Sequence, residues 1–394
     1  MLGRSARSVE TGAKAGERGG RKPFHRRRAH GIVGRMWCPR CNRTWDDEAR
    51  FCPRDGSPLS GSPDVEALSA LPSIQSGVLL GARYQVRGFI GRGAVARVYL
   101  AQDLETREPV AVKVLDTMAH KDREARERFL REASAAAAVE HPNIVKVFDT
   151  GERGDGAPYL VMEYLFGESL GAYLRREKKM HAKLAVPLLA RVASALAAAH
   201  AKGVIHRDVK PDNLYLIGEP GEAYDVRLLD FGMARLRKST MTAAGMTVGT
   251  AEYMAPEQGL SDPVDARTDV YGLGAVLYRT LTGELPFTAN DEAEMLCKLV
   301  LLSPRPPEEV NPEIEPDLAA IITAAMRKRP LNRYPSMEKL HADLETVRAQ
   351  RGAPRFAHKP IVPPDAYEPQ GPIAAALLPQ FQKLLDLRKA QRGG

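Results

Sequence analysis

Residues 204–213 read Val-Ile-His-Arg-Asp-Val-Lys-Pro-Asp-Asn, and this stretch decides the fold. It places an aspartate, a lysine and an asparagine, Asp208, Lys210 and Asn213, at positions i, i+2 and i+5. Seventeen residues after Asn213 comes Asp230, within the sequence Leu-Asp-Phe-Gly. Either short motif alone could arise by chance, so their meaning depends on what else lies at fixed distances from them.

Three further motifs follow the same stretch in a fixed order. Residues 249–257 read Gly-Thr-Ala-Glu-Tyr-Met-Ala-Pro-Glu, residues 265–271 read Asp-Ala-Arg-Thr-Asp-Val-Tyr, and residues 332–334 read Asn-Arg-Tyr. Folding alone does not require these motifs to occur together in this order and at these separations. The set indicates a catalytic site assembled from distant parts of the chain.

A glycine-rich segment lies upstream, where residues 90–99 read Ile-Gly-Arg-Gly-Ala-Val-Ala-Arg-Val-Tyr. Gly91 and Gly93 let a strand–turn–strand backbone approach phosphate groups closely. An ordinary hairpin turn would look the same, and Ala96 replaces the third glycine of a G-x-G-x-x-G pattern. This segment is therefore informative only together with the others.

A lysine inside an apolar strand is the second upstream signal. Lys113 lies in the run Val-Ala-Val-Lys-Val-Leu over 110–115, where an unpaired charge costs free energy. A helix predicted over 123–139 supplies Glu132 as a partner, and a lysine held by a glutamate can bridge the α- and β-phosphates of a nucleotide. The alternative is a lysine at a sheet edge whose ammonium reaches water.

The coarse pattern divides the chain into a β-rich part and a helical part. Short β-branched runs predict strands, and apolar residues at helical spacing predict helices. The predicted strands are 84–86, 98–102, 110–115, 145–148 and 160–164, and the clearest predicted helices are 123–139, 184–201, 268–281 and 316–326. An α+β fold follows, with a β-rich small lobe, an α-rich large lobe and a junction near 163–167.

Together these motifs carry a family resemblance. Residues 84–348, about two thirds of the chain, resemble a bilobal Hanks-type (eukaryotic-type) serine/threonine protein kinase domain, and the wording from residue 249 is similar to the bacterial branch. The resemblance implies transfer of the γ-phosphoryl group of ATP, with magnesium, to a hydroxyl of a protein substrate. Lys210 and Thr250 favour serine and threonine acceptors over tyrosine.

The resemblance also implies roles for the catalytic residues. Asp208 would accept or orient the proton of the acceptor hydroxyl, and Lys210 would steady the γ-phosphate. Asn213 and Asp230 would hold the magnesium ions, and Thr250 would bond the catalytic aspartate and lysine.

The nucleotide would lie between the glycine-rich turn and the hinge between the lobes. Lys113, paired with Glu132, would fix the α- and β-phosphates, and the backbone of residues 163–165 would face adenine. The implied nucleotide-binding residues are Ile90, Gly91, Gly93, Val98, Ala111, Lys113, Met162, Glu163, Leu165, Tyr215 and Asp230. Tyr215 departs from the family pattern, which usually has a smaller apolar residue beneath the adenine.

Three further residues match supporting contacts of the family. Glu257 and Arg333 would form an ion pair inside the large lobe. Asp269 would bond the backbone of the catalytic loop from a buried helix.

The segment between Asp230 and Thr250 carries candidate regulatory sites. Arg207 gives the catalytic loop a cation, and a phosphate on this segment would pair with it and order the segment. We expect activation-loop autophosphorylation at Thr242 and Thr247.

A cysteine-rich segment, residues 36–60, precedes the kinase-like part. It contains Cys38, Cys41 and Cys52 in two Cys-Pro-Arg-x turns, and the second turn ends at Asp55. Such turns aim ligands at one tetrahedral ion, and so short a segment cannot bury a sufficient core by itself. We expect a zinc-ribbon-like module with these four ligands, and a metal-free loop stays open as the alternative.

The net charge of +8 lies entirely in residues 1–35, which hold ten Lys/Arg and two acidic residues. Because the remainder is neutral by formal count, the charge does not favour nucleic acid as a partner. Residues 1–35 are a predicted disordered basic arm, 61–79 a linker and 349–394 a C-terminal tail. The clustered cysteines and the absence of a long uncharged apolar run predict a cytoplasmic protein with no membrane partner. The expected partners are ATP, protein substrates and a second copy for trans-autophosphorylation.

Two other functions compete with an active protein kinase. A pseudokinase scaffold, binding partners through the cysteine segment and tail, would typically lack one of the residues that this chain retains as Lys113, Asp208 and Asp230. A small-molecule kinase of similar fold is disfavoured by the long segment 230–257, which resembles a platform for protein substrates.

Overall fold

The computed structural model describes residues 36–37, 44–45, 60–61, 74–93, 95–116, 119, 122–218, 224–231 and 251–349. The chain divides into two units, Met1–Pro72 and Ser73–Gly394. In the first, the strands β1 (Met36–Trp37), β2 (Thr44–Trp45) and β3 (Ser60–Gly61) pair antiparallel in the order β2-β1-β3. The predicted arm 1–35 and the tail from residue 350 onward lie outside the described residues.

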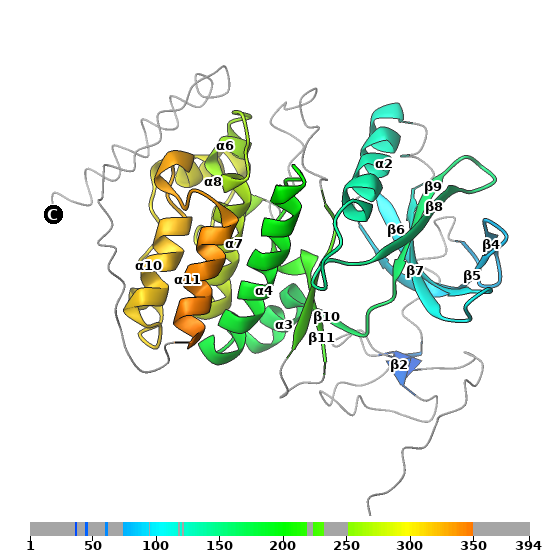
Figure 1. Ribbon diagram of the computed structural model, residues 1–394, viewed down its shortest axis with the longest axis horizontal. Helices are drawn as coiled ribbons and strands as arrows, with labels where there is room; N and C mark the ends of the chain where they lie inside the picture. The colour runs from blue at the N-terminus through cyan, green and yellow to red at the C-terminus, as the bar shows by residue number, and fades with distance from the viewer. Residues whose placement is uncertain are drawn as a thin grey trace, which may run out of the picture. The chain divides into compact units, whose positions relative to one another are not determined.

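The small lobe of the second unit is built on a six-stranded antiparallel sheet (Figure 1). In spatial order its strands are β4 (Leu79–Leu80), β5 (Tyr84–Arg92), β6 (Ala96–Asp103), β7 (Pro109–Leu115), β9 (Pro158–Glu163) and β8 (Val147–Glu152). Alternation along β7 places Val110, Val112 and Val114 in an apolar cluster on one face. Lys113 and Leu115 consequently face the other side, toward a helix.

That helix is α2 (Arg123–Ala137), which packs on the sheet through Phe129 and Ala133. Its N-terminus is capped by Asp122, whose side chain accepts a hydrogen bond from the backbone N–H of Glu124 at 2.9 Å. The prediction of a helix over 123–139 overshoots by two residues. Pro142 follows closely, and the chain must leave the helical conformation before it.

The predicted strand over 145–148 is displaced toward the C-terminus, because β8 begins at Val147. The preceding residues have other partners: the backbone N–H of Val145 donates to Leu228 O at 3.0 Å, and Ile144 forms a parallel bridge with Leu228. These bonds connect the small lobe to a strand of the large lobe, so the ladder of the small lobe starts only afterwards.

The large lobe is mainly helical (Figure 1). Its helices are α3 (Leu170–Glu177), α4 (Ala182–Ala201), α6 (Pro256–Gly259), α7 (Arg267–Thr282), α8 (Glu292–Leu301), α9 (Pro307–Val310), α10 (Pro316–Ala325) and α11 (Met337–Ala349), with 3₁₀ turns η1 (Pro211–Asn213) and η3 (Pro330–Asn332). A second sheet joins β10 (Gly167–Ser169), β11 (Leu214–Ile217) and β12 (Asp225–Leu228) in that order.

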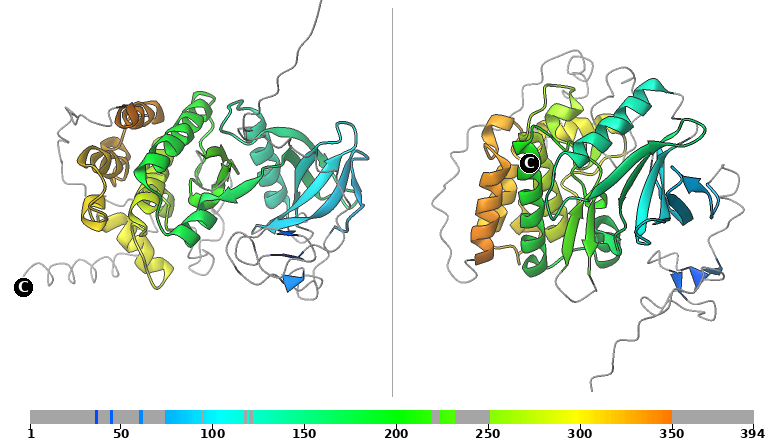
Figure 2. Two further views of the ribbon diagram at one scale, coloured as in Figure 1. Left: turned by 90° about the horizontal axis from the view of Figure 1, so that it is seen from below. Right: turned by 45° about the vertical axis from the view of Figure 1, so that its right-hand side comes forward.

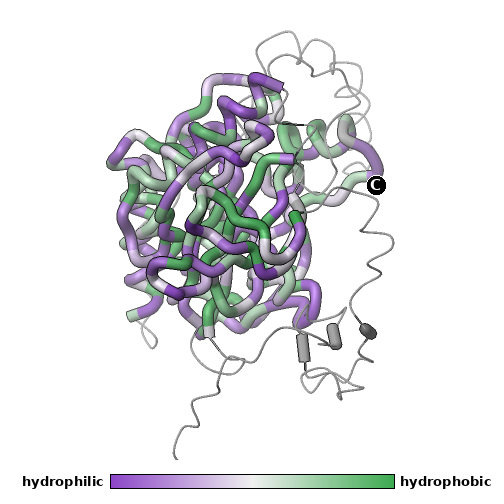
Figure 3. Tube along the Cα trace, turned by 90° about the vertical axis from the view of Figure 1, so that its right-hand side faces the viewer, coloured by the Kyte–Doolittle hydropathy of each residue, from purple (hydrophilic) through white to green (hydrophobic). Residues whose placement is uncertain are grey.

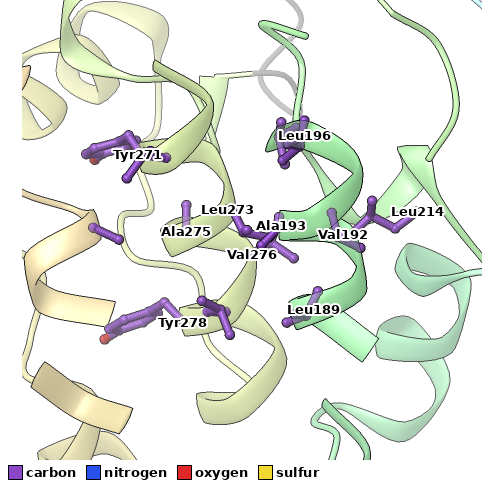
Figure 4. Packing of buried hydrophobic residues seen from close by; sticks show 14 of the residues in the cluster. Leu189, Val192, Ala193, Leu196, Leu214, Tyr271, Leu273, Ala275, Val276 and Tyr278 are labelled. Atoms are coloured by element: carbon purple, nitrogen blue, oxygen red, sulfur yellow. The ribbon is translucent and has the colours of Figure 1, made fainter. Parts of the chain in front are cut away.

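Helices α4 and α7 form the centre of the large-lobe core. Figure 4 shows Ala193 of α4 against Leu273 and Val276 of α7, and all three are fully buried. Among the described helices only α4 has the length and composition of a membrane span, and its residues are mostly buried in this core. Along the trace in Figure 3, hydrophobic and hydrophilic positions alternate in short runs, as expected where each element turns one face inward.

The two lobes are connected by residues 164–166, between the end of β9 and the start of β10. Figure 2 shows the β-rich small lobe beside the helical large lobe. Tyr164 and Phe166 stack edge to face in this connection, with ring centroids 4.8 Å apart. Residues 164–166 are outside both strand ladders, so their backbone groups remain available at the junction.

Candidate active site

The catalytic loop, residues 206–213, is anchored to the core of the large lobe. Asp269, in the first turn of α7 and 1% exposed, accepts hydrogen bonds from the backbone N–H of His206 and of Arg207, at 2.8 and 2.7 Å. His200 Nε2 lies 2.7 Å from the same carboxylate. Arg207 has a φ of 65°, in the left-handed region that a non-glycine residue occupies only where its surroundings enforce it.

His206 connects this loop to the residues before Asp230. Its Nε2 donates to Leu229 O at 2.8 Å, while its Nδ1 accepts from the backbone N–H of Asp208 at 3.2 Å. The imidazole lies against the ring of Phe231, with centroids 4.9 Å apart. The two catalytic segments are thus held together by one buried side chain.

Asp208, Lys210 and Asn213 converge as the sequence predicts. Lys210 Nζ lies 2.8 Å from Asp208 Oδ2, and Asn213 Nδ2 donates to the backbone oxygen and to Oδ2 of Asp208, at 2.8 and 3.0 Å. These contacts orient the Asp208 carboxylate, whose side chain is 16% exposed. Since Asn213 donates through Nδ2, its Oδ1 is the atom that can serve as a metal ligand.

Lys113 brings three elements together. Its Nζ lies 2.7 Å from Glu132 Oε1 of α2 and 2.7 Å from Asp230 Oδ1, which follows β12. The predicted pair with Glu132 is present, whereas the contact with Asp230 was not predicted, because no local pattern relates residues 117 positions apart. Asp230 has a φ of 53°, a second non-glycine residue in the left-handed region within the site.

The charges of this group shift one another's pKa values. Burial alone would lower the pKa of Lys113, but the charges of Asp230 and Glu132 outweigh burial and raise it. Burial raises the pKa of Glu132 to about 7, against the attraction of Lys113 and with added repulsion from Asp230. For Asp230 burial is again opposed by Lys113, and the pKa is lowered. One ammonium therefore compensates two carboxylates incompletely.

The predicted nucleotide-binding residues of the small lobe are aligned by strand register. Val98 of β6 pairs with Gly91 on one side and with Lys113 on the other, and Ala111 pairs with Met162. The turn after Ile90 closes through the backbone N–H of Gly93, which donates to Ala96 O at 2.8 Å. No described atom lies within 4 Å of where a Cβ on Gly91 would stand, so the space beside this glycine is open.

At the hinge, Glu163 and Tyr215 already have partners. The backbone N–H of Glu163 donates to Lys146 O at 2.9 Å, and its side chain accepts from the backbone N–H of Lys146, also at 2.9 Å. The hydroxyl of Tyr215 donates to Gly167 O at 3.0 Å, which links β11 to β10. Leu165 lies in the connection outside the strand ladders, where its backbone is available.

The donor set fits Mg²⁺ and a phosphate chain. Asp230 and Asn213 present hard oxygen ligands, which magnesium prefers, and the Asp230 side chain is 32% exposed. Among the described residues, Glu132 Oε2 is buried and no hydrogen-bond partner meets the geometric criteria for it. When bound, magnesium would neutralise phosphate charge, while Lys113 and Lys210 would hold the phosphates from two sides.

Supporting contacts in the large lobe are also formed. Arg333 makes two hydrogen bonds to Glu257, at 2.6 and 2.7 Å, and Thr268 donates to the same carboxylate at 2.8 Å. Gln258 Nε2 donates to Arg207 O at 2.7 Å, a contact that sequence reasoning missed. Thr250, Thr242 and Thr247 lie outside the described residues, as do the candidate zinc ligands Cys38, Cys41, Cys52 and Asp55.

Comparison with known proteins places these features in a family. Residues 84–344 match the protein kinase domain. The serine/threonine-protein kinase PknB of Mycobacterium tuberculosis is 41% identical over 286 residues, covering 71% of this chain and 45% of PknB. The serine/threonine-protein kinase pkn3 of Myxococcus xanthus is 36% identical over 320 residues, covering 77% and 58%. The chain thus spans about half the length of these relatives.

A solved structure shows the same fold. The crystal structure of the PknI kinase domain of Mycobacterium tuberculosis superposes with a TM-score of 0.56 at 28% identity, covering 70% of this chain and 99% of that one. The matched family model, these relatives and the geometry of the site point to the same family. In that geometry Lys113 contacts Glu132 and Asp230, and Asp208 contacts Lys210 and Asn213. This chain belongs to the protein kinase family, in its bacterial Hanks-type serine/threonine branch.

Proposed function

We propose that this chain is an active serine/threonine protein kinase, which transfers the γ-phosphoryl group of Mg·ATP to serine or threonine hydroxyls of proteins. The observation that carries the proposal is Lys113, placed 2.7 Å from both Glu132 and Asp230. This contact requires that α2, β7 and the segment after β12 already stand in the arrangement that phosphoryl transfer needs. The Asp208 group lies in the same lobe as Asp230 and is tied to it through His206.

Catalysis in this arrangement consists of positioning and charge stabilisation. Asp208 would accept the hydroxyl proton of the acceptor, and Lys210, 2.8 Å from its carboxylate, would face the transferred phosphoryl group. Asn213 and Asp230 would hold the magnesium ions, and the glycine-rich turn at Gly91 would cover the phosphates. A scaffold without turnover is disfavoured because none of these groups is missing.

The test is radiolabelled phosphate transfer by the purified chain to itself and to a generic protein substrate. Asp208→Asn should lower the rate by about 10²–10⁴-fold, the usual contribution of a positioned acid or base. Lys113→Met should lose comparable activity. Asp155→Asn, an aspartate paired with Arg153 in the loop between β8 and β9, is the matched control and should keep the wild-type rate.

Regulation by autophosphorylation of the segment 232–250 is part of the proposal. Arg207 of the catalytic loop supports it, since a guanidinium can bind a phosphate bidentately, and Thr242 and Thr247 are the preferred sites. Phosphatase-treated protein should show a lag before it becomes active. The double variant Thr242→Ala plus Thr247→Ala should not recover activity after the same treatment. Full activity of the treated enzyme without a lag would contradict this gating.

We also propose one structural zinc ion in the first unit, bound by Cys38, Cys41, Cys52 and Asp55. The pairing of β1 with β2 and β3 supports it, because these short strands flank the candidate ligands in the chain. Elemental analysis should find one zinc per chain, and Cys38→Ser should lose the metal while keeping kinase activity. Zinc-free wild-type protein would refute the metal site. The cytoplasmic location and self-association stay predictions.

A further inference from the structure

The peptide group that joins Arg207 to Asp208 is held at both of its polar atoms. Its carbonyl oxygen, Arg207 O, accepts a hydrogen bond from Gln258 Nε2 at 2.7 Å, and its N–H, on Asp208, donates to His206 Nδ1 at 3.2 Å. The preceding N–H, on Arg207, is the one that donates to Asp269. The proposed proton acceptor Asp208 therefore extends from a peptide plane whose orientation depends on these side chains.

The orientation of the Gln258 amide follows from its second contact. Gln258 Oε1 accepts from the backbone N–H of Ala255 at 3.1 Å, so Nε2 is the end that faces Arg207 O. Exchanging the two atoms would place an NH₂ group against an N–H and an oxygen against a carbonyl oxygen. Gln258 thus caps the start of α6 and reaches the catalytic loop at the same time, which requires one acceptor and one donor on the same side chain.

The short helix that carries Gln258 is anchored inside the large lobe. The neighbouring Glu257, 1% exposed, receives two hydrogen bonds from Arg333, at 2.6 and 2.7 Å, and one from Thr268 at 2.8 Å. Because separating a buried ion pair leaves a charge uncompensated, α6 is held firmly at this point. Gln258 therefore presents its donor to the catalytic loop from a rigid support.

We propose that Gln258 is a positioning residue for phosphoryl transfer, whose amide holds the carbonyl of Arg207 and thereby directs the Asp208 carboxylate toward the acceptor hydroxyl. The proposal rests on the proposed kinase function and adds a residue that acts through the backbone of the catalytic loop. Arg207 has a φ of 65°, a conformation that a non-glycine residue keeps only where its surroundings enforce it. Loss of the bond from Gln258 releases this backbone, and the carboxylate of the next residue moves with it.

The effect should fall on the rate of transfer and not on nucleotide binding. In the described part of the chain the hydrogen-bond partners of the Gln258 side chain are Arg207 and Ala255, and they do not include Lys113 or Asp230. KM for ATP should therefore change little. A displacement of about 1 Å in a catalytic group can cost about 10²-fold in rate, so kcat should respond strongly.

A cavity of about 30 Å³ decides which variants are informative. It is lined by Gln258 together with Arg207 and Asp208, and it is large enough for a water molecule. A truncated side chain would let water replace the amide, so the variants should keep the length of glutamine.

The test compares kcat and KM for ATP in two variants of the full chain, with a generic protein substrate. Gln258→Glu keeps the acceptor for Ala255 but places a carboxylate oxygen against Arg207 O, and Gln258→Met removes both the acceptor and the donor. At pH 8 each should lower kcat by about 10–100-fold with KM for ATP nearly unchanged. Both proteins should keep a cooperative melting transition.

The pH dependence separates a lost donor from a loosened fold. A protonated glutamic acid has an O–H that can donate to Arg207 O, so kcat of Gln258→Glu relative to wild type should recover as the pH falls from 8 to 5. Gln258→Met has nothing to protonate, and its kcat relative to wild type should stay constant. The titratable and charged side chains that line the same cavity, those of Arg207, Asp208, Tyr253 and Asp269, are common to both variants.

Gln102→Glu is the matched control. Gln102 Nε2 donates to another arginine carbonyl, Arg107 O, at 3.3 Å in the small lobe, so this variant makes the same chemical change away from the catalytic loop. It should keep the wild-type kcat at each pH. Wild-type kcat in Gln258→Glu at pH 8, or a kcat ratio that does not rise as the pH falls, would overturn the inference. If wild-type enzyme phosphorylates no serine or threonine of any protein, it is the proposed function that fails.

Discussion

At the scale of single residues, Lys113 concentrates what the sequence could and could not predict. Its position in an apolar strand and its pairing with Glu132 could be predicted from the sequence, because a buried ammonium needs a partner. Its contact with Asp230 depends on how the lobes close on each other, which no local pattern contains. The pairing of Arg175 with Asp212 was missed for the same reason.

The pH dependence of stability should report on Glu132. Its pKa of about 7 in the folded protein exceeds the usual 4.5, so its neutral form is the one that folding favours. The stabilisation of the folded protein by neutral Glu132 is complete below pH 4.5 and is lost as the pH rises through 7. Glu132→Gln imitates the neutral form, so the melting temperature of the variant relative to wild type should increase between pH 5 and 8. A difference independent of pH would contradict the raised pKa.

Asp269 should be the residue whose loss damages the site and the fold together. An asparagine at this position has one oxygen for the N–H groups of His206 and Arg207 and for His200, so at least one buried donor loses its partner. Asp269→Asn should cost about 1–3 kcal/mol in denaturant unfolding and should also lower kcat. Glu284→Gln, whose ion pair with Arg305 is exposed, is the control and should change neither.

At the scale of elements, the sequence predicted the existence of helices and strands better than their ends. The predicted helix 184–201 differs from α4 by only two residues, because its long apolar pattern belongs to a core element. The start of β8 was wrong because Ile144 and Val145 bond to Leu228 of β12 instead of continuing the ladder. Such a long-range partner leaves no signal in a short β-rich run.

The close packing of α3 on η1 gives a prediction at this scale. Gly171→Ala should force α3 away from Asp212, because the new Cβ would meet the carboxylate. Peptide phosphorylation should decrease severalfold, while the melting temperature decreases modestly. At Gly154, by contrast, no described atom lies within 4 Å of the position a Cβ would take, so Gly154→Ala should leave both unchanged.

At the scale of the whole second unit, the lobes are joined by residues 164–166 and by the pair between Lys113 and Asp230. The bilobal organisation was predictable, since the sequence changes from β-rich to helical patterns at the observed connection. The charge pairing between the lobes was not. A nucleotide that contacts both Lys113 and Asp230 would therefore touch both lobes and stabilise them as one body.

This predicts a single, shifted unfolding transition with ligand. Mg²⁺ with a non-hydrolysable ATP analogue at about 100 times its Kd should stabilise the protein by about 2.7 kcal/mol, seen as a higher melting temperature. The shift should shrink greatly in Lys113→Met and in the absence of Mg²⁺. Arg305 forms an exposed ion pair with Glu284, so the ligand should raise the melting temperature of Arg305→Ala as much as that of wild type. Two transitions, only one of them shifted, would mean that the lobes unfold independently.

The carboxylate of Asp269 also has a consequence for the time scale on which the active site can open. The amide hydrogens of His206 and Arg207 are held by a helix in the centre of the large lobe, and His206 and Asp269 are almost completely shielded from water. Their exchange with deuterium therefore requires unfolding of the lobe rather than fluctuation of a loop. In native-state exchange these two amides should be among the slowest, with the same denaturant dependence as α7. The catalytic loop would then not open independently of the large lobe. Heating would abolish activity only at temperatures that unfold this lobe.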